Sequence, residues 1–387
     1  AYILTTTHSA VNDLPTSSAA TVSNAEDTLI TYAAGNFAYT DTEGVAIDQI
    51  KITILESTGT LECQNKNGGS GGWEDCVADD YVEAGTDLRL TPASNSVADV
   101  TFSFMVHDGT AYSAAAYILT TTHAAVNDEP TLAADVTTPT FTEDGSNVVL
   151  YDNANAADTD ADETQTFEEI VVTITNVVDT TEYLVIDGSD CDITSAATCV
   201  ANTATNAGAA VVTMASTTAT VTWTADQGGI TEAQMETLID AIAYKNTDQS
   251  PTTGNTRVIT ITTLQDEGGT ANSGDDSVTV SIASTVTVAA AADLPTSAAA
   301  TVANAEDTTK TYAVGNFAFT DVDGDSIARI QITTLESSGD LECQDKNGGG
   351  TGWVDCVADD YVAAGTDLRL APVADSVADV TFSFKVH

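Results

Sequence analysis

The chain has 387 residues and a formal net charge of −48, with 10 Lys and Arg against 58 Asp and Glu. This charge excludes nucleic acid as a partner, because almost no cations are available to neutralise phosphates, and it disfavours anionic membrane surfaces. The hydrophobic share of 42% indicates a globular protein rather than an acidic disordered tail, and no apolar run approaches the roughly 18 residues of a membrane span.

Comparison of the chain with itself predicts its domain organisation. Residues 14–107 align without gaps onto 294–387, and 68 of these 94 positions are identical. Residues 2–13 match 117–128 at all but one position. We therefore expect a terminal strand (1–13), a first domain (14–128), an unlike middle domain (129–293) and an incomplete repeat of the first as a third domain (294–387).

The first domain is predicted to be a sandwich of seven or so short strands. Ile50, Ile52 and Ile54 alternate with polar residues, and the same period of two recurs over 101–106 and 117–122. This period, interrupted by Gly, Asn and Asp, is typical of antiparallel strands that are buried on one face. Regular spacing without helical segments favours an all-β sandwich.

The six cysteines form three close pairs, each inside one domain: Cys63 with Cys76, Cys191 with Cys199, and Cys343 with Cys356. Their even number and local pairing favour disulfides, and therefore an oxidising, extracellular setting. Closing so short a loop contributes roughly 3 kcal/mol in the chain-entropy model. Zinc is the alternative, although no CxxC motif or histidine lies near these cysteines.

The middle domain is predicted to contain one helix. Thr231 can cap it, and Gln234 occupies the capping-box position. The helix then carries one apolar stripe, formed by Met235, Leu238, Ile239 and Ile242. We expect this helix to pack over an open end of the sandwich, and we expect strands at 258–263 and 277–288.

The third domain stops at His387, the counterpart of His107, and lacks the turn and final strand of the first domain. A sandwich without that strand exposes a sheet edge and part of its core. The missing strand occurs in the chain as residues 1–13. Two explanations remain open: the chain is one stretch of a giant covalent repeat protein, or residues 1–13 complete the third domain of a neighbour in a head-to-tail homopolymer.

Short motifs recur where the domains join. The stretch AAVNDEPT (124–131) reappears as SAVNDLPT (9–16) and, without its Asn, as AAADLPT (290–296). Each copy is followed by an acidic EDT or EDG, and two domains contain F-x-[FY]-T-D-x-[DE]-G. The middle domain adds Y-x-N-T after its helix. Together these motifs resemble bacterial cadherin-like tandem repeats, the calcium-binding Ig-like modules of giant surface adhesins and extracellular matrix or filament proteins.

The resemblance implies three Ig/cadherin-like antiparallel β-sandwiches with Ca²⁺ at the joints. The implied ligands are, in the linkers, Asn12, Asp13, Asn127, Asp128 and Asp293; in the early acidic pairs, Glu26, Asp27, Glu143, Asp144, Glu306 and Asp307; in the acidic clusters, Asp41, Glu43, Asp158, Asp160, Asp162, Asp321, Asp323 and Asp325; and after the penultimate strands, Asp108 and Asp266. Ala292 replaces the Asn of the third linker and weakens the site expected there.

The spacing of these carboxylates supports calcium independently. Calcium takes about six to eight oxygens, so acids two apart on a loop are an efficient source of ligands. DVDGDS (321–326) supplies three acids around a glycine. Residues 158–169 resemble the start of an EF-hand, but Glu163 occupies the glycine position and a strand is expected to follow. The alternative for each cluster is a solvated acidic turn.

No catalytic constellation is visible. Gly68–Gly72 matches G-x-S-x-G, but it lies in a glycine-rich hairpin and its repeat lacks the serine. Trp73 and Trp353 could contact a glycan or could simply cover the hairpin. The sequence predicts a non-enzymatic, extracellular structural protein, a calcium-stiffened filament or adhesin stalk. A module that binds a glycan or a cell-surface receptor is the alternative of another class.

Overall fold

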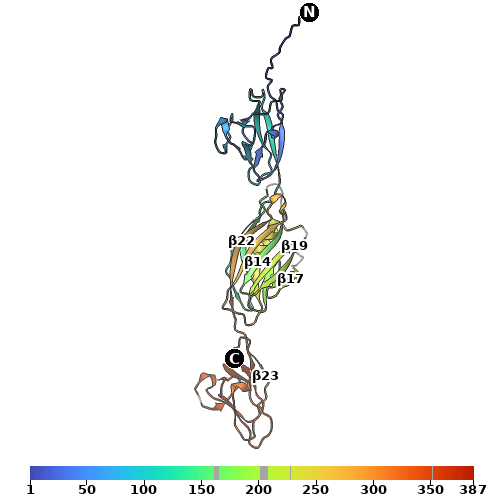
Figure 1. The fold of residues 1–387 in the computed structure, drawn as a ribbon. Coiled ribbons are helices and arrows are strands. Elements are labelled where there is room, and N and C mark those ends of the chain that lie inside the picture. The colour runs from blue at the N-terminus through green and yellow to red at the C-terminus, as the bar shows by residue number, and fades with distance from the viewer. Residues whose placement is uncertain (161–164, 201–207, 227, 351) are drawn as a thin grey trace.

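The computed structural model describes residues 1–160, 165–200, 208–226, 228–350 and 352–387. Three bodies of β-structure follow one another in a row, and residues 1–13, the N-terminal segment, extend away from the first body (Figure 1). Every sheet forms within one of the ranges 14–128, 129–293 and 294–387. The predicted all-β architecture of tandem sandwiches is confirmed.

The first domain, all of which is described, packs a five-stranded sheet (β1-β9-β8-β3-β6) on a four-stranded one (β2-β7-β4-β5). β1 runs parallel to β9, and the other paired neighbours of the larger sheet are antiparallel. The elements are β1 (Ala20–Ala25), β2 (Ile30–Tyr32), η1 (Ala34–Phe37), β3 (Gln49–Ile54), β4 (Thr60–Cys63), η2 (Lys66–Gly68), β5 (Glu74–Asp75), β6 (Tyr81–Glu83), β7 (Leu88–Thr91), β8 (Val100–His107) and β9 (Tyr117–Ala124).

The alternating pattern places one face of each strand in the core of the first domain. Ile50 and Ile52 on β3 and Phe102 and Phe104 on β8 are buried. The expectation was wrong for Ile54, which is 64% exposed. The register between β3 and β8 shifts after Ile52, and a bulge of this kind breaks the alternation of side chains between the two faces.

The middle domain is built on a seven-stranded sheet (β11-β22-β21-β14-β19-β18-β17), a four-stranded sheet (β12-β20-β15-β16) and the pair β10-β13. Its elements are β10 (Thr131–Val136), β11 (Thr140–Thr142), β12 (Val148–Val149), β13 (Tyr151–Ala157), β14 (Phe167–Thr175), β15 (Glu182–Ile186), β16 (Ser189–Asp192), β17 (Ala197–Val200), β18 (Gly208–Ala215), β19 (Thr218–Ala225), α1 (Glu232–Asp240), β20 (Ala243–Asn246), β21 (Arg257–Asp266), η3 (Ala271–Ser273) and β22 (Ser277–Ala289).

Helix α1 forms where it was predicted. The Thr231 side chain accepts a bond from Gln234 N, which completes the capping box. The apolar stripe of α1 is buried in the core of the middle domain. The described residues contain no helix with the length and apolar character needed to cross a membrane.

A buried ionic cluster in the middle domain surrounds Arg257, and two residues of the Y-x-N-T motif, Tyr244 and Asn246, donate to its acids. Arg257 is fully buried and donates to Glu182 at 2.9 Å and to Asp179 at 2.7 Å. It also donates to the carbonyls of Thr252 and Asn255 at 2.9 and 2.7 Å. The guanidinium thereby neutralises two buried carboxylates and holds a loop against the sheet, which makes it essential to this core.

The third domain repeats most of the first and differs from it in several strands. Its sheets are β24-β30-β27-β28, β29-β26-β31 and the pair β23-β25, and its described residues contain no counterparts of β1 and β9. Its elements are β23 (Thr296–Ala298), β24 (Lys310–Tyr312), η4 (Val314–Asn316), β25 (Ala318–Thr320), β26 (Arg329–Thr334), β27 (Asp340–Cys343), η5 (Lys346–Gly348), β28 (Val354–Asp355), β29 (Tyr361–Ala363), β30 (Leu368–Ala371) and β31 (Ser383–Val386).

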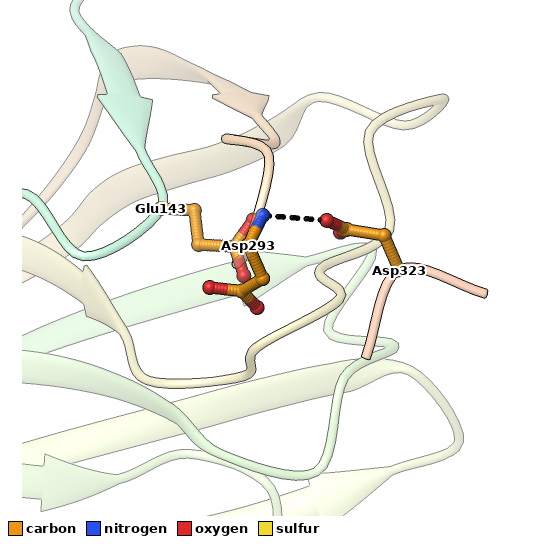
Figure 2. A group of neighbouring side chains, drawn as sticks. All are labelled: Glu143, Asp293 and Asp323. Carbon is orange, nitrogen blue, oxygen red and sulfur yellow. Dashed lines mark hydrogen bonds between the residues drawn. The ribbon is translucent and has the colours of Figure 1, made fainter. Parts of the chain in front are cut away.

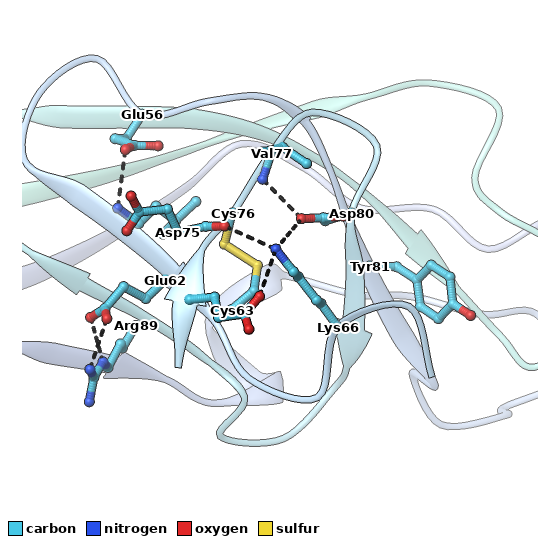
Figure 3. Close-up of a disulfide and its surroundings, with 12 residues drawn as sticks. Glu56, Glu62, Cys63, Lys66, Asp75, Cys76, Val77, Asp80, Tyr81 and Arg89 are labelled. Atoms are coloured by element: carbon cyan, nitrogen blue, oxygen red, sulfur yellow. Dashed lines mark hydrogen bonds and ion pairs between the residues drawn. A yellow bond between two sulfur atoms is a disulfide. The ribbon is translucent and has the colours of Figure 1, made fainter. Parts of the chain in front are cut away.

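All three predicted disulfides form, Cys63–Cys76, Cys191–Cys199 and Cys343–Cys356, and the zinc alternative is excluded. Figure 3 shows the first of them at the end of β4. Lys66 lies beside it, donates to the Asp75 carbonyl at 3.3 Å and contacts the Asp80 carboxylate at 3.5 Å. Disulfide and lysine together close the hairpin.

We expect Arg257→Met to destabilise the middle domain by about 3–5 kcal/mol, because it leaves two buried carboxylates without a counter-ion. Arg89→Met is the matched control, since Arg89 bonds Glu62 through two nitrogens at 2.7 and 3.0 Å but is partly exposed. The control should cost about 0–1 kcal/mol. Denaturant unfolding of both variants measures the difference, and equal costs would contradict this account of the cluster.

Candidate metal centres

Asn127 lies at the centre of the first joint, the linker residues 125–130. Its amide nitrogen donates to Asp266 Oδ1 at 3.0 Å and to the Asp275 carbonyl at 2.8 Å. Its side-chain oxygen accepts a bond from Gln165. Because Asp266 ends β21 and Asp275 precedes β22, Asn127 fastens the linker to the end of the large sheet.

Carboxylates of both neighbouring domains contact this linker. Val126 N donates to Glu26 Oε1 of the first domain at 2.8 Å, and Asp128 N donates to Asp160 Oδ1 of the middle domain at 3.1 Å. A cavity of about 360 Å³ opens beside them. Its acidic lining residues are Glu26, Asp27, Asp128, Glu129 and Asp275. The first joint therefore concentrates negative charge in a recess between two domains.

Asp266 is the deepest acid of the first joint, at 1% exposure. Burial raises the pKa of its carboxyl, and the nearby charges of Asp276 and Asp158 raise it further, although bonds from Gly268 N and Asn127 act in the opposite direction. A raised pKa means that the ionised carboxylate is destabilised here unless positive charge is brought to it.

Three carboxylates converge at the second joint, the linker residues 290–295. Glu143, Asp293 and Asp323 each place one carboxylate oxygen within 4.8 Å of the others (Figure 2). Glu143 directly follows β11, Asp293 lies in the linker, and Asp323 lies in the loop after β25. The linker is held by bonds from Ala291 N to Glu143 at 2.9 Å and from Asp293 N to Asp323 at 2.7 Å.

The same loop of the third domain carries a second acidic group. Asp321, Asp323 and Asp325 also place ligand oxygens within 4.8 Å of one another. Burial, followed by the charges of Asp323, Asp144 and Asp321, raises the pKa of Asp293. The replacement of Asn by Ala292 was expected to weaken this joint. Among the described residues, however, the two acidic groups that could hold a metal ion both lie beside it.

The N-terminal face of the first domain repeats the arrangement of the first joint. Asn12 donates to Asp108 Oδ2 at 2.9 Å, as Asn127 does to Asp266, and Asp13 N donates to Glu43 at 3.1 Å. Asp41 accepts a bond from Val45 N at 2.9 Å. Burial raises the pKa of Asp108, but bonds from Ala111 N, the Asn12 amide and Thr110 N outweigh it, so that the pKa is lowered overall.

The remaining predicted ligands lie apart from these groups or make bonds within their own domain. Asp27, Asp144 and Asp307 accept bonds from Asn95 N, the Gln249 amide and Asp375 N, respectively. Asp158 accepts bonds from Asp160 N and Gln165 N, and Glu306 is exposed. Asp162 lies outside the described residues. A strand, β14, follows this acidic loop, so an EF-hand is excluded.

The donor set fits a hard cation. Within the described residues, Asp41 Oδ2, Glu143 Oε1, Asp266 Oδ2 and Asp293 Oδ2 are buried oxygens with no hydrogen-bond partner. Glu143 is 3% exposed, and a buried carboxylate oxygen without a partner is costly. All the atoms on offer are oxygens, which calcium and magnesium prefer to the nitrogen and sulfur ligands of softer metals.

Sequence reasoning missed two residues of the first joint. Gln165 bonds both Asn127 and Asp160 and so connects the linker with the acidic loop. Gly268 lies so close that a Cβ there would overlap the Asn127 side chain. Neither residue belongs to a motif, and their proximity to the linker arises only when the ends of β14 and β21 come together.

The other singled-out residues make ordinary structural contacts. Arg89 of β7 stacks on the Trp73 ring at 4.3 Å, as Arg369 of β30 does on Trp353 at 4.2 Å, so each hairpin indole covers an arginine of a neighbouring strand. His107 contacts Asp48 at 3.2 Å at the end of β8. The G-x-S-x-G stretch lies between β4 and β5, which is not the strand-to-helix turn of a hydrolase nucleophile.

No protein-family model matches the chain, and no curated protein matches it. Among solved structures, it is similar to protocadherin gamma B2 extracellular cadherin domains 1–5, at 12% identity and a TM-score of 0.40 over 94% of this chain and 55% of that one. It is also similar to Drosophila N-cadherin EC1–4, at 11% identity and a TM-score of 0.25 over 95% and 74%. The chain thus spans about half of the first structure's length, and likenesses at these scores establish neither family nor function.

We expect the calcium-free middle domain to lose stability as pH rises above about 4, the usual pKa of an aspartate. The pKa of Asp266 is raised, so the folded state binds more protons than the unfolded state in that window. Asp266→Asn should reduce this loss. Thermal melts in chelator from about pH 4 upward measure it, with Asp152→Asn, an exposed acid of the same domain, as the control. Identical slopes for all three chains would contradict the assignment.

Proposed function

We propose that the protein is a non-enzymatic, extracellular structural protein whose calcium-stiffened joints make it a filament subunit or an adhesin stalk. The observation that carries this proposal is the convergence of Glu143, Asp293 and Asp323 from three separate segments at the second joint. Two of these residues have a buried oxygen with no partner. A divalent cation would neutralise such a group of acids.

Calcium would limit bending between the domains and would take no part in a chemical reaction. Without a cation, the clustered carboxylates repel one another, and any bend that separates the domains relieves this repulsion. When bound, the cation supplies positive charge that joins linker and domain oxygens into one unit. At the first joint, Glu26, Asn127, Asp128, Asp160 and Asp266 would hold it; at the second, Glu143, Asp293, Asp321 and Asp323.

Two further features support an extracellular setting. Each domain contains one disulfide, and disulfides persist in oxidising compartments rather than in the cytosol. The net charge of −48 suits a protein that stays solvated in calcium-containing surroundings. The proposal includes head-to-tail assembly, in which the N-terminal segment of one copy joins the third domain of a neighbour.

Calcium should raise the melting temperature and straighten the molecule. At a free calcium concentration of about 100 times Kd, one site that is absent from the unfolded chain contributes about 2.7 kcal/mol, which corresponds to several degrees for a domain of this size. Scanning calorimetry with millimolar calcium and with EDTA measures the first effect, and small-angle scattering measures the maximum dimension. Superimposed melts in the two conditions would refute the joint sites.

The matched variant combines Glu143→Gln with Asp293→Asn. It removes the negative charge of both side chains at the second joint and keeps their shape. It should lose the calcium-dependent gain there while the first joint keeps its own. Asp340→Asn, an exposed acid of β27, is the control. A calcium response that is unchanged in the double variant would place the cation elsewhere.

A further inference from the structure

The third domain contains an open groove where the first domain has a strand. The groove has a volume of about 780 Å³. Its walls include residues 300–302 on one side and Val380, Phe382 and Phe384 on the other. In the alignment of the two repeats, residues 300–302 correspond to part of β1, and Val380, Phe382 and Phe384 correspond to residues of β8. In the first domain, β1 and β8 are the two strands that flank β9.

The same side chains are covered in one repeat and uncovered in the other. Phe102 and Phe104 are buried in the first domain, whereas their counterparts Phe382 and Phe384 are only half-buried. Residues 300–305 form no strand, although their counterparts form β1. The third domain therefore exposes an apolar floor and the unpaired edge of β31, the features that accept an added strand.

The N-terminal segment has the sequence of the strand that fills this position in the first domain. Residues 2–13 differ from 117–128 only at Ser9, which replaces Ala124. The segment is unpaired, and its apolar side chains face solvent: Leu4 is 94% exposed, whereas its counterpart Leu119 in β9 is fully buried. Leu4 therefore has the sequence surroundings of a core residue, but its side chain is exposed to solvent.

We propose that residues 2–9 of a second copy fill the groove as a β-strand, antiparallel to residues 380–384 and parallel to residues 300–305. This proposal deepens the head-to-tail assembly and rests on it. The register follows from the first domain, where Leu119 pairs with Phe102 on one side and Ala20 on the other. Leu4 of the incoming copy accordingly pairs with Phe382 and Ala300.

Two side chains anchor the strand in this register. Leu4 enters the apolar floor, as Leu119 does. Thr6 takes the place of Thr121, a buried residue whose hydroxyl lies 2.6 Å from the Tyr32 hydroxyl. Tyr312, the counterpart of Tyr32, lines the groove and offers its hydroxyl to Thr6.

The bonds of the linker extend the match beyond the strand. In the first domain, Glu26 N donates to the Ala124 carbonyl at 3.0 Å and Glu26 Oε1 accepts from Val126 N at 2.8 Å. Glu306, the counterpart of Glu26, is exposed at the end of the groove. Ser9 and Val11 of the incoming segment supply the matching carbonyl and amide.

The occupant comes from another copy, because the segment and the groove lie at opposite ends of the molecule (Figure 1). The position in the nearer first domain is already taken by β9. One end of each copy thus donates and the other accepts, and such a heterologous contact builds an open chain of copies unless the rotation between them closes a ring.

Charge substitutions within residues 2–9 test this directly, because these residues are exposed in their own copy. Leu4→Asp should abolish self-association of the 387-residue chain, measured by sedimentation velocity and electron microscopy over a hundredfold range of concentration. Ile3→Asp is the matched control, since its counterpart Ile118 is 51% exposed in β9. It adds the same charge one residue away and should retain assembly. Equal behaviour of the two variants, or a parent chain that stays monomeric, would overturn the proposal.

A peptide of residues 2–13 tests the acceptor. It should block assembly of the parent chain and protect the amides of residues 300–305 and 380–384 from hydrogen exchange, whereas the Leu4→Asp peptide should do neither. Absence of protection, or reduced and denatured native material of several hundred kilodaltons instead of 39.8 kDa, would overturn donation between copies. The effect of calcium on the melting temperature is measured separately. Loss of strand donation between copies can therefore be distinguished from loss of the calcium-stiffened joints.

Discussion

Repulsion between carboxylates at the joints is the constraint on which the rest of the structure depends. Each linker passes between acids contributed by two domains, and some of their oxygens are buried without a partner among the described residues. The negative charge destabilises such an arrangement, and the chain has almost no positive charge of its own to offset it. Cations bound at the joints, as proposed above, would couple the shape of the molecule to its surroundings.

The sandwiches serve as rigid frames for these acids. Asp266 lies at the end of β21, Glu143 directly after β11, and Asp323 in a loop that leaves β25. Disulfides and the Arg257 cluster stiffen the domains away from the joints. Because the ligand oxygens are fixed at strand ends, the proposed cation would act on the joint between domains and leave each core as it is.

The open groove of the third domain offers a joint of the same kind between neighbouring copies. A joint inside the chain has a completed strand before it, a linker with an acidic residue, and an acidic loop after it. The proposed contact between copies assembles the same parts, with the strand and linker from one copy and the floor and Glu306 from the other. A filament built in this way would have equivalent joints within and between its subunits.

The sequence by itself determined the features that depend on neighbouring residues or on the repeat. These include the β-period, the capping box at Thr231, the three cysteine pairs and the repeat of the first domain in the third. It also placed acids at every linker. Only the tertiary structure decided which of these acids meet, that Gln165 joins them, that Ile54 turns outward at a bulge, and that Arg257 is buried between two acids. These outcomes depend on contacts between distant segments, whose distances and burial no local pattern of residues encodes.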